Sequence, residues 1–386
     1  MSPQSKREYL EAIWIRYKHA SRKEKSTILT EFMANCSFHR KHATRLLNTF
    51  RRFSKPKLKK RGKPSRYNIP AVLEPLKRIW LAANLPCSKR LKAVLPIWIP
   101  GYAQEFGPLS LDVMNLLRHI SAPTIDRLLK ATRVKYTRRG RSTTKPGTLL
   151  RKQIPIKTNQ WDEKRPGFLE ADTVAHCGES TFGIYANTLD LVDIATGWTE
   201  QRAVWGKGET DVLRQIKHVE SVLPFPLLGF DADNGGEFLN YHLVHHFANH
   251  PNKPQFTRSR PYHKDDNAHV EQKNWTHVRQ WLGYHRFDNY KIVQLMNELY
   301  MNEWRFYHNF FQPSVKLLNK KLVDGKHIKS YDNPRTPYQR ILDSKYIKAS
   351  AKQALTQQFE TLNPFLLRKA IESRLKDISK LCYRKL

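Results

Sequence analysis

The sequence predicts a multidomain protein with an all-α N-terminal part, an α/β domain built on a mixed five-stranded sheet, and a helical C-terminal region. Three observations lead to this prediction. The chain has 386 residues, which is long for a single domain. Apolar residues recur at helical spacing up to about residue 135. Beyond residue 160, short apolar runs separated by turn residues are typical of strands.

Residues 1–50 are expected to form a small domain of three helices. Ser21 and Glu24 have the spacing of a capping box at the start of the second helix. The third helix resembles the basic recognition helix of a helix-turn-helix unit. A solvated face on three packed helices would give the same pattern. The polar face of this third helix carries Arg40, Lys41, Thr44 and Arg45.

Two basic stretches interrupted by Pro and Gly, residues 51–67 and 136–160, are predicted to be linkers that can lie along phosphates. Between them, residues 68–135 predict a second helical DNA-binding domain. Its last helix would expose Arg127 and Lys130. Plain helix packing explains this helix equally well.

Residues 161–319 predict the α/β domain. Short connections require its first three strands to pair antiparallel. These strands are expected at residues 167–174, 184–192 and 198–204. Helical crossovers then lead to two further strands, in LLGFDAD and at residues 255–258, which should run parallel. This order resembles the ribonuclease-H-like fold. Residues 320–386 are expected to be a helical tail.

The chain is strongly basic, with 68 Lys and Arg against 34 Asp and Glu and a formal net charge of +34. Such a surface attracts polyanions and gains affinity by releasing their counterions, so nucleic acid is the favoured partner. A membrane partner is not predicted, because no long apolar stretch is present. The four Cys lie far apart and form no C-x-x-C pair, so we expect a cytoplasmic, nucleoid-associated protein.

Three carboxylates stand out in this basic chain: Asp172 in FLEADTV, Asp233 in FDADNGGEF and Glu271 in NAHVEQKN. Asp172 lies within the first strand. Asp233 ends the fourth strand, at the edge where open α/β sheets bind ligands, and is preferred over its neighbour Asp231. As single residues, all three could instead be surface charges paired with Lys or Arg.

Glu271 is expected on a helix that follows the loop SRPYHKDDNAHV. Helical spacing predicts a stripe along that helix which packs toward the sheet and brings Glu271 opposite the strand aspartates. The stripe consists of Asn274, Trp275, Val278 and Leu282.

These motifs resemble the DDE catalytic domain of bacterial insertion-sequence transposases and retroviral integrases. The resemblance implies a DNA transposase that binds terminal inverted repeats, exposes a 3′-hydroxyl and joins it to target DNA, acting as a homo-oligomer. In many family members a basic residue follows the Glu by seven positions. Here that position is Val278, and Arg279 comes one residue later. The N-terminal zinc-binding set of retroviral integrases is missing, so zinc is not predicted.

Two divalent ions about 4 Å apart can activate a nucleophile and stabilise the leaving oxygen in phosphoryl transfer. We therefore expect two Mg²⁺ (or Mn²⁺) ions, with Asp172 bridging both while Asp233 and Glu271 each complete one. Further DNA contacts are predicted around these acids, at His263, Lys264, Lys273 and Arg279.

Two alternatives remain open at this point. One is a catalytically silent, domesticated DNA-binding regulator, and the other is a ribonuclease-H-like nuclease. Joining of pre-cleaved DNA ends separates a transposase from a nuclease, and cleavage of supercoiled DNA in the presence of Mg²⁺ or Mn²⁺ separates both from a regulator.

Overall fold

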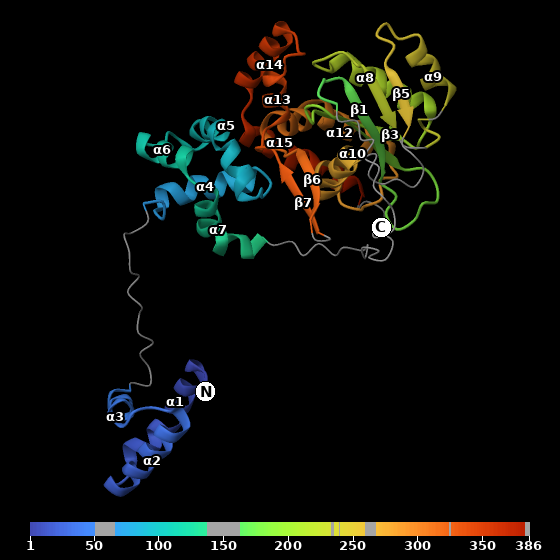
Figure 1. Ribbon diagram of the computed structural model, residues 1–386. Helices are drawn as coiled ribbons and strands as arrows, with labels where there is room; N and C mark the ends of the chain where they lie inside the picture. The colour runs from blue at the N-terminus through green and yellow to red at the C-terminus, as the bar shows by residue number, and fades with distance from the viewer. Residues whose placement is uncertain are drawn as a thin grey trace. The chain divides into compact units, whose positions relative to one another are not determined.

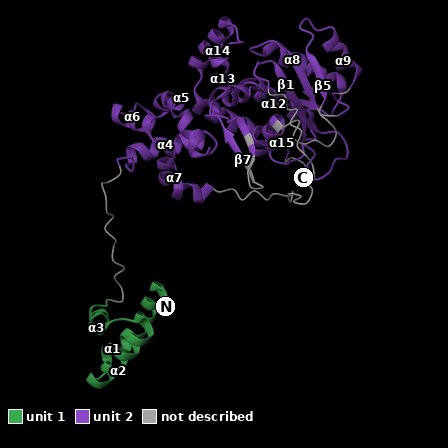
Figure 2. Ribbon diagram, viewed as in Figure 1, with its two compact units in different colours: residues 1–65 green, residues 66–386 purple. Residues whose placement is uncertain are grey.

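The structure is a computed structural model that forms two compact units, residues 1–65 and 66–386 (Figure 2). The residues it describes are 1–50, 66–136, 163–232, 235–238, 240–258, 268–323 and 326–382, except for the side chains of residues 268, 320, 322, 323, 326 and 327.

Unit 1 is a bundle of three helices around a small apolar core. Phe32 is fully buried at its centre and makes ring contacts with Tyr9 and Phe38. The predicted capping box is confirmed, since Ser21 and Glu24 satisfy each other's backbone N–H groups at the start of the second helix. The helices are α1 (Pro3–His19), α2 (Arg22–Cys36) and α3 (Arg40–Thr49).

Unit 2 contains a mixed sheet of five strands, of which β1, β3 and β5 are labelled in Figure 1. The strand order is β3-β2-β1-β4-β5. Strands β1, β2 and β3 pair antiparallel, and β1–β4 and β4–β5 pair parallel. The predicted mixed sheet is thereby confirmed. The strands are β1 (Phe168–Ala175), β2 (Ala186–Asp193), β3 (Thr199–Trp205), β4 (Gly229–Ala232) and β5 (Gln255–Arg258).

Helices α8 and α9 connect strands of this sheet, and a series of helical segments follows β5. The helix expected from about residue 237 begins only at Tyr241, because the Asn240 side chain caps it by accepting a hydrogen bond from the N–H of Leu243. These segments are α8 (Glu209–Val222), α9 (Tyr241–Ala248), α10 (Ala268–Lys273), the π-helix η2 (Asn274–Arg279), α11 (Gln280–Leu282), α12 (Tyr290–Leu299), and the π-helices η3 (Tyr300–Trp304) and η4 (Tyr307–Phe311).

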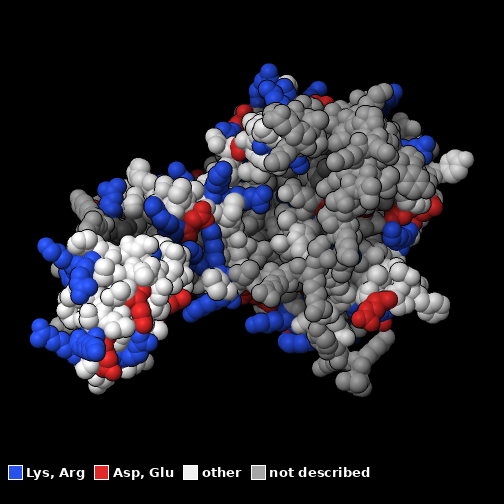
Figure 3. Space-filling view, turned by 60° about the horizontal axis from the view of Figure 1, so that its bottom comes forward, with Lys and Arg blue, Asp and Glu red and all other residues white. Residues whose placement is uncertain are grey.

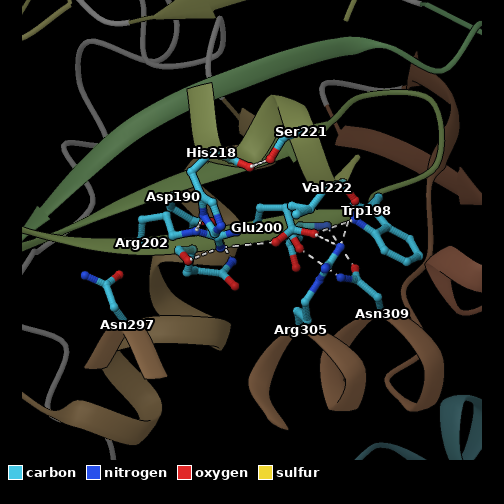
Figure 4. A network of polar contacts seen from close by, with 12 residues as sticks. Asp190, Trp198, Glu200, Arg202, His218, Ser221, Val222, Asn297, Arg305 and Asn309 are labelled. Carbon is cyan, nitrogen blue, oxygen red and sulfur yellow. Dashed lines mark hydrogen bonds and ion pairs between the residues drawn. The ribbon is translucent and has the colours of Figure 1, made fainter. Parts of the chain in front are cut away.

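A buried network of hydrogen bonds and ion pairs links β3 to the helices packed beside it (Figure 4). The carboxylate of Glu200 accepts hydrogen bonds from Trp198 Nε1 at 3.0 Å and from Arg202 Nη1 at 3.2 Å. Arg305 lies 2.7 Å from the same carboxylate, between η3 and η4. Arg202 also donates to His218 of α8. Each buried charge of this network therefore has a partner of opposite charge or a hydrogen-bond partner, as burial in an apolar interior requires.

The remaining helices of unit 2 share one apolar core with the sheet. Trp98 donates to the carbonyl of Phe311, and Asn363 donates to the carbonyl of Gly101. The boundary between the two compact units lies after residue 65 of the sequence. The finer division of unit 2 into domains stays a prediction. These helices are α4 (Pro70–Ala82), α5 (Ser88–Phe106), α6 (Leu111–His119), α7 (Ala122–Tyr136), α13 (Pro337–Asp343), α14 (Ala349–Thr361) and α15 (Pro364–Cys382).

The C-terminal region is not purely helical, and that prediction is corrected. An antiparallel pair, β6 (Leu317–Val323) and β7 (Lys326–Tyr331), precedes α13. The dipeptide Asp324-Gly325 between the two strands is a hairpin signal in the sequence. No helix in the described part of the chain is long and apolar enough to span a bilayer.

Candidate active site

Asp172 lies in β1, in the middle of the sheet, and its carboxylate is held in place. Oδ1 accepts a hydrogen bond from the N–H of Thr173 at 2.7 Å, and Oδ2 accepts one from Nδ2 of Asn274 at 2.6 Å. Asn274 comes three residues after Glu271 along the same helical segment. The structure therefore joins the strand of Asp172 directly to the segment that carries Glu271.

Glu170 makes a second connection between the same two elements. It shares a face of β1 with Asp172 and is 3% exposed. Its Oε2 accepts hydrogen bonds from the backbone N–H groups of His269 and Val270, both at 3.0 Å, in the first turn of α10. Burial raises the pKa of Glu170 to about 8, with Asp231 and Glu271 adding to the rise, while the two N–H groups oppose it. Glu170 thus fixes where the helix of Glu271 begins.

Asp190 lies beside Asp172 on the same face of the sheet, because the two residues are directly opposite each other in the antiparallel register of β1 and β2. It is fully buried, and Gln201 Nε2 donates to its Oδ1 at 2.7 Å. Burial raises the pKa of Asp190 to about 7, and the Asp172 charge adds to this, while Gln201 and Lys273 oppose it. The buried surroundings of Asp172 therefore contain a second carboxyl and a Lys whose charge partly compensates it.

Lys273 does not fit its predicted DNA contact. The side chain is 8% exposed, and Nζ lies 3.2 Å from Nε2 of His277. Burial lowers the pKa of Lys273 to about 8, although the charge of Asp190 favours the protonated form. A Lys is normally exposed, so the sequence favoured a surface position. Its interior partner Asp190 is distant in sequence, and no local pattern reveals it.

Asp231, the rival of Asp233, is a buried residue of β4 with an internal role. Its Oδ1 accepts a hydrogen bond from Thr257 Oγ1 of β5 at 2.6 Å, and in the parallel register it lies beside Glu170. Asp233 itself lies outside the described residues. The preference for Asp233 over Asp231 stays a prediction.

Glu237, in the DNGGEF motif, is a further buried acid that the sequence analysis did not single out. It accepts hydrogen bonds from Thr173 Oγ1 at 2.8 Å and from Lys207 Nζ. Burial alone would raise its pKa, but the bonds from Lys207, its own backbone and Thr173 outweigh burial and lower the pKa. Glu237 therefore ties the segment after β4 to β1, beside Asp172.

The segment after Glu271 differs from the expected helix, because residues 274–279 form a π-helix. Val278 is fully buried as predicted, but Trp275 is 48% exposed, so the prediction that Trp275 packs toward the sheet is wrong. A π-helix has more residues per turn than an α-helix, which changes the faces that follow it.

Arg279 holds the end of β1. Its Nη2 donates to the carbonyl of Ala175 at 2.7 Å, and the guanidinium lies 4.8 Å from the ring centre of Tyr284. A DNA contact by Arg279 stays a prediction.

The other predicted DNA-contacting residues stand as follows. Arg40, Lys41 and Arg45 are exposed on α3, and Thr44 is half-buried. Arg127 and Lys130 are exposed on α7. His263 and Lys264 lie outside the described residues. The six residues on α3 and α7 therefore stay predicted DNA contacts, which the structure does not test.

Among the residues that the structure describes, no group of three or more His, Cys, Asp or Glu is arranged to hold a metal ion. Asp172 and Glu271 are both described, and the third predicted ligand, Asp233, is not. Carboxylate oxygens are the donors that Mg²⁺ prefers. Asn274 Oδ1, beside Asp172, is buried and has no hydrogen-bond partner among the described residues. The donor chemistry therefore fits a hard divalent cation.

No protein-family model matches the chain. A curated relative, the uncharacterized protein y4rM of Sinorhizobium fredii, is 37% identical over 342 residues, which cover 88% of this chain and 96% of the relative. The chain belongs to the y4rM family. The match covers more residues than unit 2 of this y4rM-family chain contains, so it extends into unit 1.

Solved structures similar to the y4rM-family chain include two retroviral proteins. The catalytic core domain of BIV integrase has a TM-score of 0.30 and 12% identity, and the match covers 47% of this chain and 96% of that one. The HTLV-2 integrase catalytic core domain, in complex with magnesium, has a TM-score of 0.27 and 16% identity, with 42% and 94% covered.

Proposed function

We propose that this protein is a DNA transposase or integrase that catalyses metal-dependent strand cleavage and strand transfer. One observation carries the proposal: the hydrogen bond from Asn274 to Asp172 seats the helical segment of Glu271 against β1. The two backbone N–H groups that donate to Glu170 support the same placement. Together with the extended motif around Asp233, this arrangement supports a polynucleotidyl transferase of the DDE type.

Asp172, Asp233 and Glu271 would hold Mg²⁺ or Mn²⁺ through their carboxylate oxygens. Bound divalent ions supply the activation of a nucleophilic water or 3′-hydroxyl and the stabilisation of charge on the phosphate. The chain's own contribution is to fix the ligands: Thr173 and Asn274 orient Asp172, and Glu170 sets the start of the helix before Glu271. Preorganised ligands lose less freedom when the substrate binds.

The proposed substrate is double-stranded DNA, as terminal inverted repeats and as target. On the face that Figure 3 shows, Lys and Arg occur at many places among the described residues and Asp and Glu at fewer, in keeping with the net charge of +34. Phosphate contacts of this kind give salt-dependent affinity. Within the proposal, α3 supplies contacts to the element ends, and a homo-oligomer holds two ends together.

The test uses the full-length protein with supercoiled plasmid DNA and Mg²⁺ or Mn²⁺. We expect Asp172→Asn, Asp233→Asn and Glu271→Gln each to lower strand cleavage by about a hundredfold or more, because each removes a charged metal ligand. DNA affinity should stay within about twofold, since none of the three belongs to the basic surface. Asp112→Asn, which changes an exposed acid on α6, is the matched control and should cleave normally.

The remaining outcomes separate the alternatives. Cleavage that survives in Asp172→Asn or Glu271→Gln would contradict the assignment of that residue. Cleavage without joining of pre-cleaved ends would indicate a nuclease. DNA binding by the unmodified protein with no cleavage under either metal would indicate a regulator.

A further inference from the structure

One face of the segment after Glu271 carries exposed aromatic side chains. Glu271 is exposed, and Trp275 follows it by four residues, so the two are neighbours on the same helical face. Arg279 follows Trp275 by another four residues within the π-helix, where a turn contains more than four residues, so it stays on that face. The acid, the indole and the guanidinium form a row.

The π-helix separates Val278 from the face of Glu271. In a regular α-helix Val278, seven residues after Glu271, would share that face. In the structure Val278 is fully buried, whereas Trp275, near the start of the π-helix, is exposed like Glu271. π-helical turns often occur at functional sites.

Trp275 is more exposed than every other Trp that the structure describes. Trp98, Trp198 and Trp304 are each at most 2% exposed, whereas Trp275 is 48% exposed. Among the described residues, Trp275 makes no ring contact and does not belong to the partly buried residues packed on the apolar core. The exposed face of this large apolar ring, one helical turn from Glu271, is available to a ligand that covers it.

Tyr284 extends the row. It is 65% exposed, and the Arg279 guanidinium lies 4.8 Å from its ring centre. Arg279 is anchored in turn, because its Nη2 donates to the carbonyl of Ala175 at the end of β1. The ring of Tyr284 therefore lies beside a guanidinium that is itself held by a hydrogen bond to β1. We call Trp275, Arg279 and Tyr284 the aromatic row.

We propose that the aromatic row is a stacking platform for unpaired bases of the DNA strand next to Glu271. The proposal rests on the proposed function for its ligand class. Indole and phenol rings stack on the π-face of any base, and an adjacent guanidinium adds cation–π attraction. A strand melted at a DNA end offers such bases, and the net charge of +34 favours a polyanion over a protein partner.

The experiment measures binding without metal, so that no cleavage is needed. The probe is a duplex with two unpaired terminal nucleotides, one of them 2-aminopurine, and the reference is the fully paired duplex of the same length. Trp275→Ala should weaken binding of the probe about tenfold, the loss expected for one stacked base, and leave the reference within about twofold. Quenching of 2-aminopurine should be lost, while Trp275→Phe should retain most of both signals.

Tyr241→Ala is the matched control, since Tyr241 is an aromatic residue of α9 that is 92% exposed. It should behave like the unmodified protein. Equal binding of the probe by Trp275→Ala and the unmodified protein would overturn the proposal. A change of oligomeric state in Trp275→Ala, measured by light scattering, would overturn it in favour of an interface between two copies. Cleavage that survives in the metal-ligand variants would contradict the proposed function, and intact quenching in the same experiments would leave the platform standing, so the two proposals fail separately.

Discussion

Glu170 is the residue on which the position of the Glu271 helix depends most directly. Its carboxylate is almost completely buried, an arrangement that is costly unless hydrogen bonds compensate. Two backbone N–H groups of α10 supply those bonds. Without them, the first turn of α10 would have unsatisfied N–H groups beside the sheet. We therefore regard Glu170 as a positioning residue.

Glu170→Ala should lower the free energy of unfolding by about 2 kcal/mol, because two hydrogen bonds of about 1 kcal/mol each are lost. Glu170→Gln keeps a carbonyl oxygen at this position and should lose less. Urea denaturation measures this difference. Under the proposed function, Glu170→Ala should also raise the Mg²⁺ concentration for half-maximal cleavage, and Glu170→Gln should largely restore it. An unchanged Mg²⁺ requirement in a folded Glu170→Ala variant would show that Glu170 stabilises the fold without positioning the metal ligands.

The sequence points to three acids of the proposed site and not to the buried acids beside them. Extended motifs select Asp233 and Glu271, and Asp172 is selected mainly by its position in the first strand. Glu170 and Asp190 were not selected, because the role of a buried acid depends on partners such as Val270 and Gln201, which are brought near by the fold.

At the scale of elements, helix α3 combines a buried apolar side with an exposed basic side. Ala43 and Leu47 are buried in the core of unit 1, while Arg40 and Arg45 are exposed. The three-helix arrangement leaves this basic side accessible. Its use as a recognition helix stays a proposal.

Arg40→Ala and Arg45→Ala should each weaken DNA binding. Each lost phosphate contact should reduce the slope of log affinity against log salt by about 1. Titrations at several salt concentrations measure this slope. The control is Arg7→Ala on α1, which removes an exposed Arg paired with Glu11. If all three variants lose affinity equally, the effect belongs to the net charge of unit 1 and not to α3.

The elements of unit 2 also show where sequence periodicity reaches its limit. Antiparallel pairing of β1 with β2 and of β2 with β3 was predictable, because the connections between these strands are too short for a parallel crossover. The π-helix after Glu271 was not predictable, since the apolar spacing of Val278 and Leu282 also fits a regular helix. The hairpin of β6 and β7 was missed although the sequence carries an Asp-Gly signal.

At the scale of the whole molecule, the two units have separate apolar cores. Each core is contained within its own unit. Separate cores predict that the units unfold independently.

Calorimetry of the full chain should therefore show two transitions. Phe32→Ala, at the centre of unit 1, should cost about 3–5 kcal/mol and abolish or lower the transition of unit 1 alone. Leu76→Ala, at a fully buried position of α4, should lower only the transition of unit 2. A single transition that both substitutions shift together would show that the units fold as one.

The sequence by itself determined the helical N-terminal unit, the mixed five-stranded sheet and the motifs that select Asp172, Asp233 and Glu271. These features depend on periodicity, connection length and residue type, which are local properties of the chain. Only the tertiary structure decided that Lys273 is buried, that Glu170 and Asn274 hold the helix of Glu271, and that Trp275 is exposed. Such facts depend on which distant segments meet, and the pairing of residues about a hundred positions apart is set by packing of the whole unit.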